Sequence, residues 1–121
     1  MIPAAVSAAA RAAGRHLLSE PLRVTLDVPA AHGIVAPKAI YLAFSRDGAL
    51  HYIGKVDRAA GHAGQRLGEH LRISLRKRRT WRTVWVLPLA ATMPPADLLA
   101  TERALIRCYR PPGNIQHAAA A

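Results

Sequence analysis

The sequence predicts an α+β fold, a small three-stranded antiparallel sheet flanked by helices, with an N-terminal extension made of a helix and a strand. Two apolar, β-favouring stretches, residues 39–44 and 50–53, are separated by Asp47-Gly48, a pair typical of hairpin turns. A leucine at every fourth position from Leu67 to Leu75 indicates a helix with one apolar face. The 121 residues suffice for one domain with one hydrophobic core.

The first 37 residues form the predicted extension. Residues 1–19 are rich in alanine and predict a helix or a frayed tail; their charges follow the apolar run, the opposite of the order in a signal peptide. Alternation over residues 22–28 predicts a strand that packs on the core or covers an edge strand. Gly33 and Pro37 mark the end of this segment.

The predicted core domain covers residues 38–117, and residues 118–121 form a loose tail. Its elements follow the order strand, strand, helix, strand, helix, which defines an α+β arrangement. After the two hairpin strands we expect a loop over 54–64, a helix over 63–78, a strand over 81–87 and a helix over 96–109. The segment Pro111-Pro112-Gly113 cannot continue that last helix.

Charge is the first indication of function. Lys and Arg number 17 against 7 Asp and Glu, a formal net charge of +10. Such a balance favours a polyanionic partner, most commonly nucleic acid, although an anionic membrane surface or an acidic protein remain alternatives. No apolar stretch reaches the length of about 18 residues that a membrane span needs, so we expect no membrane association. The single cysteine, Cys108, excludes an intramolecular disulfide and argues against a Cys-rich zinc site, which fits the reducing cytoplasm.

Glu102 is the first candidate site residue. It is surrounded on its predicted helix face by apolar residues three and four positions away, Leu98, Leu99, Leu105 and Ile106. A carboxylate on an apolar stripe is costly to bury unless it is paired or binds a metal. The alternative is a glutamate at the rim of the stripe, or one paired with an arginine.

Arg66 and His70 are four residues apart on the other predicted helix and project to the same side. Arginine can clamp a phosphate through its planar guanidinium, and histidine can act as a general base. The alternative is a solvated basic helix with an incidental histidine.

Tyr41 and Tyr52 lie on the two hairpin strands. With the turn at Asp47-Gly48, paired residues have numbers that sum to about 94 or 95, which puts Tyr41 roughly opposite Ile53 and Tyr52 one step away. The alternative interpretation is that both tyrosines only pack.

A basic run extends from the predicted helix over 63–78 to the third strand, with Trp81 and Trp85 interleaved. Cations of this kind neutralise phosphates, and an exposed indole can stack on a base. The alternative is a solvated helix end with both tryptophans in the core. The candidate nucleic-acid-binding residues in the run are Arg72, Arg76, Lys77, Arg78, Arg79 and Arg82.

The order and spacing of these residues resemble the GIY-YIG nuclease superfamily over residues 38–117. The matching positions are Ala39-Ile40-Tyr41, Tyr52-Ile53-Gly54, Arg66, His70, Glu102 and Asn114 after Pro-Pro-Gly. The resemblance implies a three-stranded antiparallel sheet flanked by helices. It also implies phosphodiester hydrolysis with one divalent metal ion, Mg²⁺ or Mn²⁺.

The resemblance implies a role for each matched residue. Glu102 is the metal ligand, Tyr41 is the tyrosine near the attacking water, and Tyr52 positions the water or the phosphate. Because Glu102 is a single acidic ligand, water and phosphate oxygens complete the metal shell, which Mg²⁺ tolerates well.

The resemblance also implies that the remaining matched residues surround this centre, with the following roles. Arg66 stabilises the charge of the phosphate in the transition state, and His70 assists proton transfer. Asn114 supports the site structurally or touches the phosphate. Lys55 resembles the lysine of the repair-type members.

The sequence therefore predicts a metal-dependent endonuclease that nicks DNA, more readily than RNA, with tolerance for sequence or structure. An alternative is a non-catalytic nucleic-acid-binding module with the same fold. It is motivated by Ala39 in place of the family's first glycine and by the long segment from Gly54 to Arg66. A basic protein that binds an acidic partner is a third hypothesis, but it leaves the spacing unexplained. A monomer and a homodimer are both compatible with the sequence.

Overall fold

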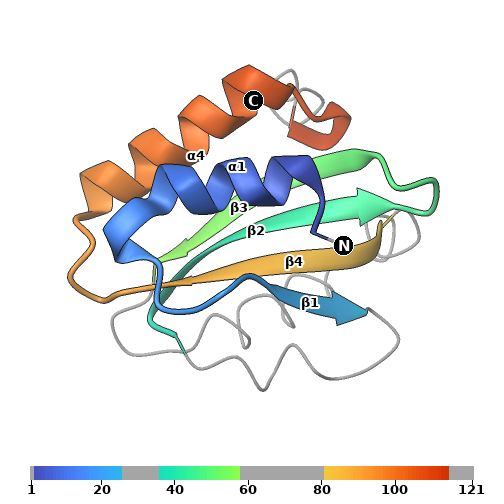
Figure 1. Ribbon diagram of the computed structural model, residues 1–121. Coiled ribbons are helices and arrows are strands. Elements are labelled where there is room, and N and C mark those ends of the chain that lie inside the picture. The colour runs from blue at the N-terminus through green and yellow to red at the C-terminus, as the bar shows by residue number, and fades with distance from the viewer. Residues whose placement is uncertain (1, 26–35, 58–80, 115–121) are drawn as a thin grey trace.

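The computed structural model describes residues 2–25, 36–57 and 81–114, which form an α+β fold of helices on an antiparallel sheet (Figure 1). This confirms the predicted fold class. In chain order the elements are α1 (Ala4–Ala13), the 3₁₀ helix η1 (Gly14–His16), β1 (Leu22–Thr25), β2 (Lys38–Ser45), β3 (Leu50–Asp57), β4 (Trp81–Leu89) and α4 (Pro95–Tyr109). The helix expected over 63–78 lies outside the described residues, as does the tail at 118–121.

The sheet contains four strands in the order β1-β4-β2-β3, and neighbouring strands are antiparallel. The expected number was three. The additional strand is β1 from the N-terminal extension, which pairs with β4 from Leu22 opposite Val86 onward. The extension therefore does both of the things that the sequence allowed, because β1 covers the edge at β4 and α1 packs on the core.

Helix α1 ends earlier than the alanine-rich sequence suggests. The sequence predicted a helix to about residue 19, but α1 stops at Ala13, because Gly14 has a φ of 56° that a continuing helix does not permit. One turn of 3₁₀ helix follows, and Leu17 then forms a β-bridge with Leu89. Figure 1 shows α1 and α4 on the same face of the sheet.

Buried side chains form a cluster on each face of the sheet. The cluster under the helices joins Val6 and Ala9 of α1 to Leu98 of α4 and to alternate residues of β2, among them Leu42. The other cluster contains the remaining residues of β2: Ala39, Tyr41 and Ala43, together with Val56, Trp81, Val84 and Val86. Strand β2 is buried on both faces because it lies inside the sheet, and its alternation puts Tyr41 on the face opposite the helices.

The β2–β3 hairpin turns at Asp47-Gly48, as predicted. The Gly48 N–H donates to the Ser45 carbonyl at 3.0 Å, and Gly48 has a φ of 84°, which favours glycine. The Asp47 carboxylate accepts hydrogen bonds from the Ser45 hydroxyl and from the Ala49 N–H. These hydrogen bonds hold the pKa of Asp47 below its ordinary value.

The pairing in the hairpin agrees with the predicted sum of about 94 or 95, although the residue opposite Tyr41 is the neighbour of Ile53. Tyr41 lies opposite Gly54, and Tyr52 lies opposite Ala43. The cause is a shift between Ala43 and Phe44, where Phe44 still pairs with Leu50 and the next pair skips one residue of β3. Strand β3 also continues to Asp57, so residues 54–57 are strand where a loop was expected.

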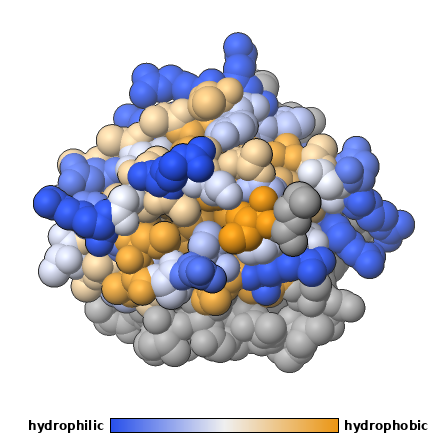
Figure 2. Space-filling view, viewed as in Figure 1, coloured by the Kyte–Doolittle hydropathy of each residue, from blue (hydrophilic) through white to orange (hydrophobic). Residues whose placement is uncertain are grey.

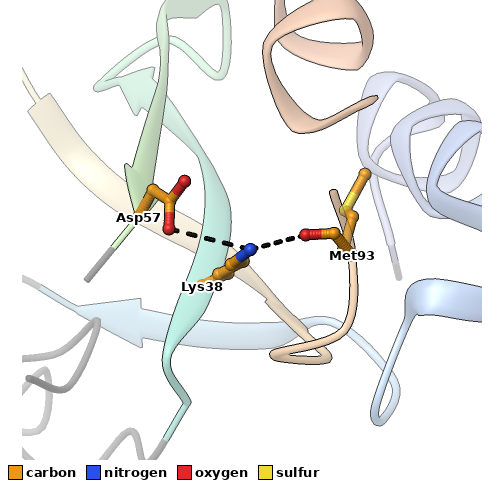
Figure 3. A network of polar contacts seen from close by, with 3 residues as sticks. All are labelled: Lys38, Asp57 and Met93. Atoms are coloured by element: carbon orange, nitrogen blue, oxygen red, sulfur yellow. Dashed lines mark hydrogen bonds and ion pairs between the residues drawn. The ribbon is translucent and has the colours of Figure 1, made fainter. Parts of the chain in front are cut away.

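Lys38 is a buried cation at the end of the sheet away from the hairpin turn, with only 8% of its surface exposed. Its Nζ donates a hydrogen bond of 2.5 Å to the Met93 carbonyl and lies 3.8 Å from an Asp57 carboxylate oxygen (Figure 3). Both partners compensate for the loss of water around the ammonium group. Lys38 thus joins β2, β3 and the segment before α4.

The elements at the C-terminal end follow the sequence prediction closely. Strand β4 begins at Trp81 as expected and runs to Leu89, and α4 begins one residue before the predicted start and ends at Tyr109. Within the described parts of the chain, no helix has the length and apolar character needed to cross a membrane.

Candidate active site at the β3 edge

Asn114 fixes the segment after α4 to the outer edge of β3. The Ile53 N–H donates to the Asn114 Oδ1 at 2.8 Å, and the Asn114 Nδ2 donates to the Ile53 carbonyl at 2.8 Å. The side-chain amide therefore satisfies both backbone groups that Ile53 turns away from β2. Of its two expected roles, structural support matches this geometry, because each end of the amide already binds the backbone.

Tyr41 and Tyr52 come together on the face of the sheet opposite the helices. Their ring centroids are 6.1 Å apart with an angle of 32° between the planes. Trp81 completes the aromatic group, with its ring centroid 5.6 Å from that of Tyr52 and 6.4 Å from that of Tyr41. Such distances are typical of interacting aromatic pairs, so the three rings hold one another in place.

Gly54 allows the Tyr41 ring to lie across β3. A Cβ atom at position 54 would come within 2.8 Å of the Tyr41 Cε1 and would overlap with the ring carbon and hydroxyl beyond it. No larger side chain fits without displacing Tyr41. Gly54 is thus a position where the site requires a close approach between a backbone and a ring.

Glu102 lies on α4, and its carboxylate is close enough to Tyr52 to affect the pKa of that tyrosine. The carboxylate is half-buried, and burial raises the pKa of Glu102, while the positive charges of Lys55 and Arg103 act in the opposite direction. The pKa of Tyr52 is also raised, first by burial and then by the negative charge of Glu102, and a hydrogen bond with Tyr41 opposes this shift. Glu102 is thus electrostatically coupled to Tyr52 and to Lys55, and Tyr52 in turn contacts Tyr41.

The other predicted site residues are distributed differently. Arg82 is exposed at the beginning of β4 and, together with Arg23 and Arg46, lines a depression on the sheet, not the tyrosine pair. The predicted residues Arg66, His70, Arg72, Arg76, Lys77, Arg78 and Arg79 lie outside the described residues.

Trp81 and Gly54 have roles that sequence reasoning did not assign. Trp81 is only 3% exposed and contacts both tyrosines, so it is the packing partner of the site and not a free surface for a base. Trp85 is partly buried against the cluster under the helices. A glycine inside a strand is a sequence signal of close backbone approach, and Gly54 carried that signal once β3 is extended to Asp57.

The described residues could hold a divalent metal ion only through Glu102 as a single protein ligand. Among the described residues, no group of three or more His, Cys, Asp or Glu side chains is placed to hold a metal ion. Glu102 is a single half-buried carboxylate, and the raised pKa reflects negative charge that is not fully compensated. A hard cation that retains several waters and is completed by phosphate oxygens fits such a donor set, and Mg²⁺ has these properties.

Comparisons with protein-family models, with curated proteins and with solved structures each found no significant match to this chain.

Proposed function

We propose that this chain is a metal-dependent endonuclease that hydrolyses phosphodiester bonds in DNA. The observation that carries the proposal is the electrostatic coupling of Glu102 on α4 with Tyr52 and Lys55 on β3, together with the ring contact between Tyr52 and Tyr41 of β2. Packing alone does not require a half-buried carboxylate that is electrostatically coupled to a tyrosine and a lysine. A phosphodiester-cleaving site requires this combination of a metal ligand, hydroxyls that orient water, and a cation.

Glu102 is the residue that would hold Mg²⁺ or Mn²⁺. When bound, the metal supplies a positive charge that polarises the phosphate and activates water. Burial raises the pKa of Glu102 and its positive neighbours lower it, so a bound cation would favour the carboxylate further. Lys55, exposed on β3 beside Glu102, supplies a second positive charge for a phosphate oxygen.

The two tyrosines have different tasks in this proposal. Burial and the negative charge of Glu102 raise the pKa of Tyr52, and its hydroxyl would donate a hydrogen bond that orients the water or the phosphate. Tyr41 hydrogen-bonds with Tyr52 and is held by Gly54 and Trp81, so its hydroxyl can pass a proton within a fixed geometry. Asn114 keeps β3 in place beneath both.

The experiment is nicking of supercoiled plasmid at low salt with Mg²⁺ or Mn²⁺, beside an EDTA control. We expect metal-dependent nicking that disappears in Glu102→Gln, which removes the charge and keeps the shape. The matched control is Glu20→Gln, because Glu20 is an exposed glutamate in the segment before β1 and its loss changes the net charge equally.

Two outcomes would contradict the proposal. One is equal nicking by the wild type and Glu102→Gln, which would point to a contaminating nuclease. The other is an inert wild type that binds DNA in a salt-sensitive way but cleaves neither plasmid, branched DNA nor RNA with any of these metals. That second result would favour the non-catalytic nucleic-acid-binding module.

A further inference from the structure

Three arginines from separate parts of the chain surround one depression on the sheet. Arg23 lies on β1, Arg46 in the β2–β3 turn and Arg82 on β4, and all three are exposed. Two aromatic residues, Trp85 and Phe44, also line the depression, whose volume is about 440 Å³. Figure 2 shows hydrophilic side chains gathered at the hairpin end of the sheet.

The strand pairing explains why these residues meet. Arg23 is directly opposite Trp85, so both side chains project to the same face of the sheet. Trp85 and Phe44 belong to the cluster under the helices, so the depression is on the face opposite Tyr41 and Tyr52. Pro3, the residue directly before α1, also lines the depression. The depression therefore lies next to the N-terminal end of α1.

The positive charge of the depression is not neutralised within the described structure. No acidic residue lines it, and none of the three arginines forms an ion pair with a residue that the structure describes. Asp47 follows Arg46 in the chain, but its carboxylate is engaged by Ser45 and Ala49 in the turn. Three uncompensated guanidinium groups around a partly exposed indole form a surface that attracts phosphates and presents a ring face for stacking.

We propose that this depression binds one unpaired strand of nucleic acid, with the three arginines on successive phosphates and Trp85 against a base. An unpaired strand is the occupant that fits, because only an unstacked base exposes a face to an indole, whereas duplex DNA offers phosphates alone. The inference rests on the proposed function in that it gives the same substrate a second contact, on the other face of the sheet. Cleavage would then be favoured next to single-stranded segments.

The test is binding of a fluorescent oligothymidylate in EDTA, so that the result does not depend on cleavage. The triple variant Arg23→Gln/Arg46→Gln/Arg82→Gln is compared with Arg11→Gln/Arg15→Gln/Arg107→Gln, which removes the same charge at exposed positions outside the depression. We expect the first variant to lose about tenfold or more in affinity. Its plot of log K against log salt should become shallower by about 2, since each phosphate contact to a single strand contributes roughly 0.7. The second variant should lose clearly less.

Trp85→Leu distinguishes the contribution of base stacking to the binding affinity from that of the positive charges. It should weaken binding of oligothymidylate while leaving the salt dependence unchanged, and binding of a duplex of equal length should not change. Equal losses in both triple variants, or an equal effect of Trp85→Leu on duplex and single strand, would overturn the inference. Tighter binding to vesicles of anionic lipid than to the oligonucleotide, lost in the same variant, would overturn it as well. If plasmid nicking fails while these binding results hold, only the nuclease proposal fails.

Discussion

The side chain of Asn114 forms two hydrogen bonds with the backbone of Ile53, a residue 61 positions earlier in the chain. One amide thus occupies the place that a neighbouring strand would take beside β3. An unpaired strand edge is open to water and to other chains, and this contact blunts it at the position next to the candidate site. The same contact determines where the chain lies after α4 ends at Tyr109.

Asn114→Ala removes both hydrogen bonds and leaves two partly buried backbone groups of Ile53 without this partner. We expect the free energy of unfolding to fall by about 1–3 kcal/mol, as for lost hydrogen bonds at a partly buried position. Chemical denaturation measures the difference, with Glu20→Ala as a surface control. An unchanged stability in Asn114→Ala would show that water replaces the amide without cost.

Gly54→Ala places a methyl group where the ring of Tyr41 now lies. We expect a loss of stability of about 1–3 kcal/mol from overpacking, together with loss of nicking as Tyr41 is displaced. Leucine at position 41 does not reach as far as the outer ring atoms of tyrosine, with which the new methyl group would overlap. In a Tyr41→Leu background, Gly54→Ala should therefore cost much less stability. A double-mutant cycle measures this coupling. Additive effects of the two substitutions would contradict the contact.

Local sequence signals predicted the elements whose cause is local. Asp47-Gly48 predicted the hairpin because Gly48 alone accounts for the positive φ of the turn. The last helix was bounded by the prolines around it, and α4 begins at Pro95. The order of strands and helices then gave the fold class.

Contacts between distant parts of the chain had no such signal. The pairing of β1 with β4 puts Leu22 opposite Val86, and no residue pattern in either segment predicts that the two strands pair. The register shift beside Phe44 moved Tyr41 from Ile53 to Gly54, and a turn pair alone does not specify a bulge. The position of Glu102 near Tyr52 depends on how α4 packs on β3. The spacing in the sequence therefore identified both residues as candidates, but it did not predict how they are arranged in space.

Lys38→Met tests the buried cation shown in Figure 3. Methionine retains the aliphatic part of the side chain but loses the hydrogen bond to the Met93 carbonyl and the ion pair with Asp57. We expect the free energy of unfolding to fall by about 1–3 kcal/mol, mainly because the Met93 carbonyl loses its charged donor. Thermal unfolding measures the change, and Arg107→Met, at an exposed site on α4, is the control. Stability equal to or above the wild type would show that desolvation of the ammonium outweighs its partners.

Glu102→Gln connects the site to stability and to pH. The pKa of Glu102 is raised in the folded protein, so the folded state binds a proton more tightly than the unfolded state does. Stability of the wild type should therefore decrease as the pH rises from the ordinary glutamate pKa through the raised one, and it should stay lower above that window. Glu102→Gln removes the titrating group, so it should be more stable than the wild type at neutral pH.

That difference between the wild type and Glu102→Gln should shrink as the pH falls through the raised pKa to the ordinary glutamate value, and it should change no further below that value, where the carboxyl is protonated in both states. Denaturation curves over a series of pH values measure it, with Glu20→Gln as the exposed control. Addition of Mg²⁺ at neutral pH should raise the stability of the wild type but not of Glu102→Gln, because only the carboxylate gains a ligand in the folded state. If Mg²⁺ stabilises both proteins equally, Glu102 is not the metal ligand, and the cost of burying its charge serves some purpose other than metal binding.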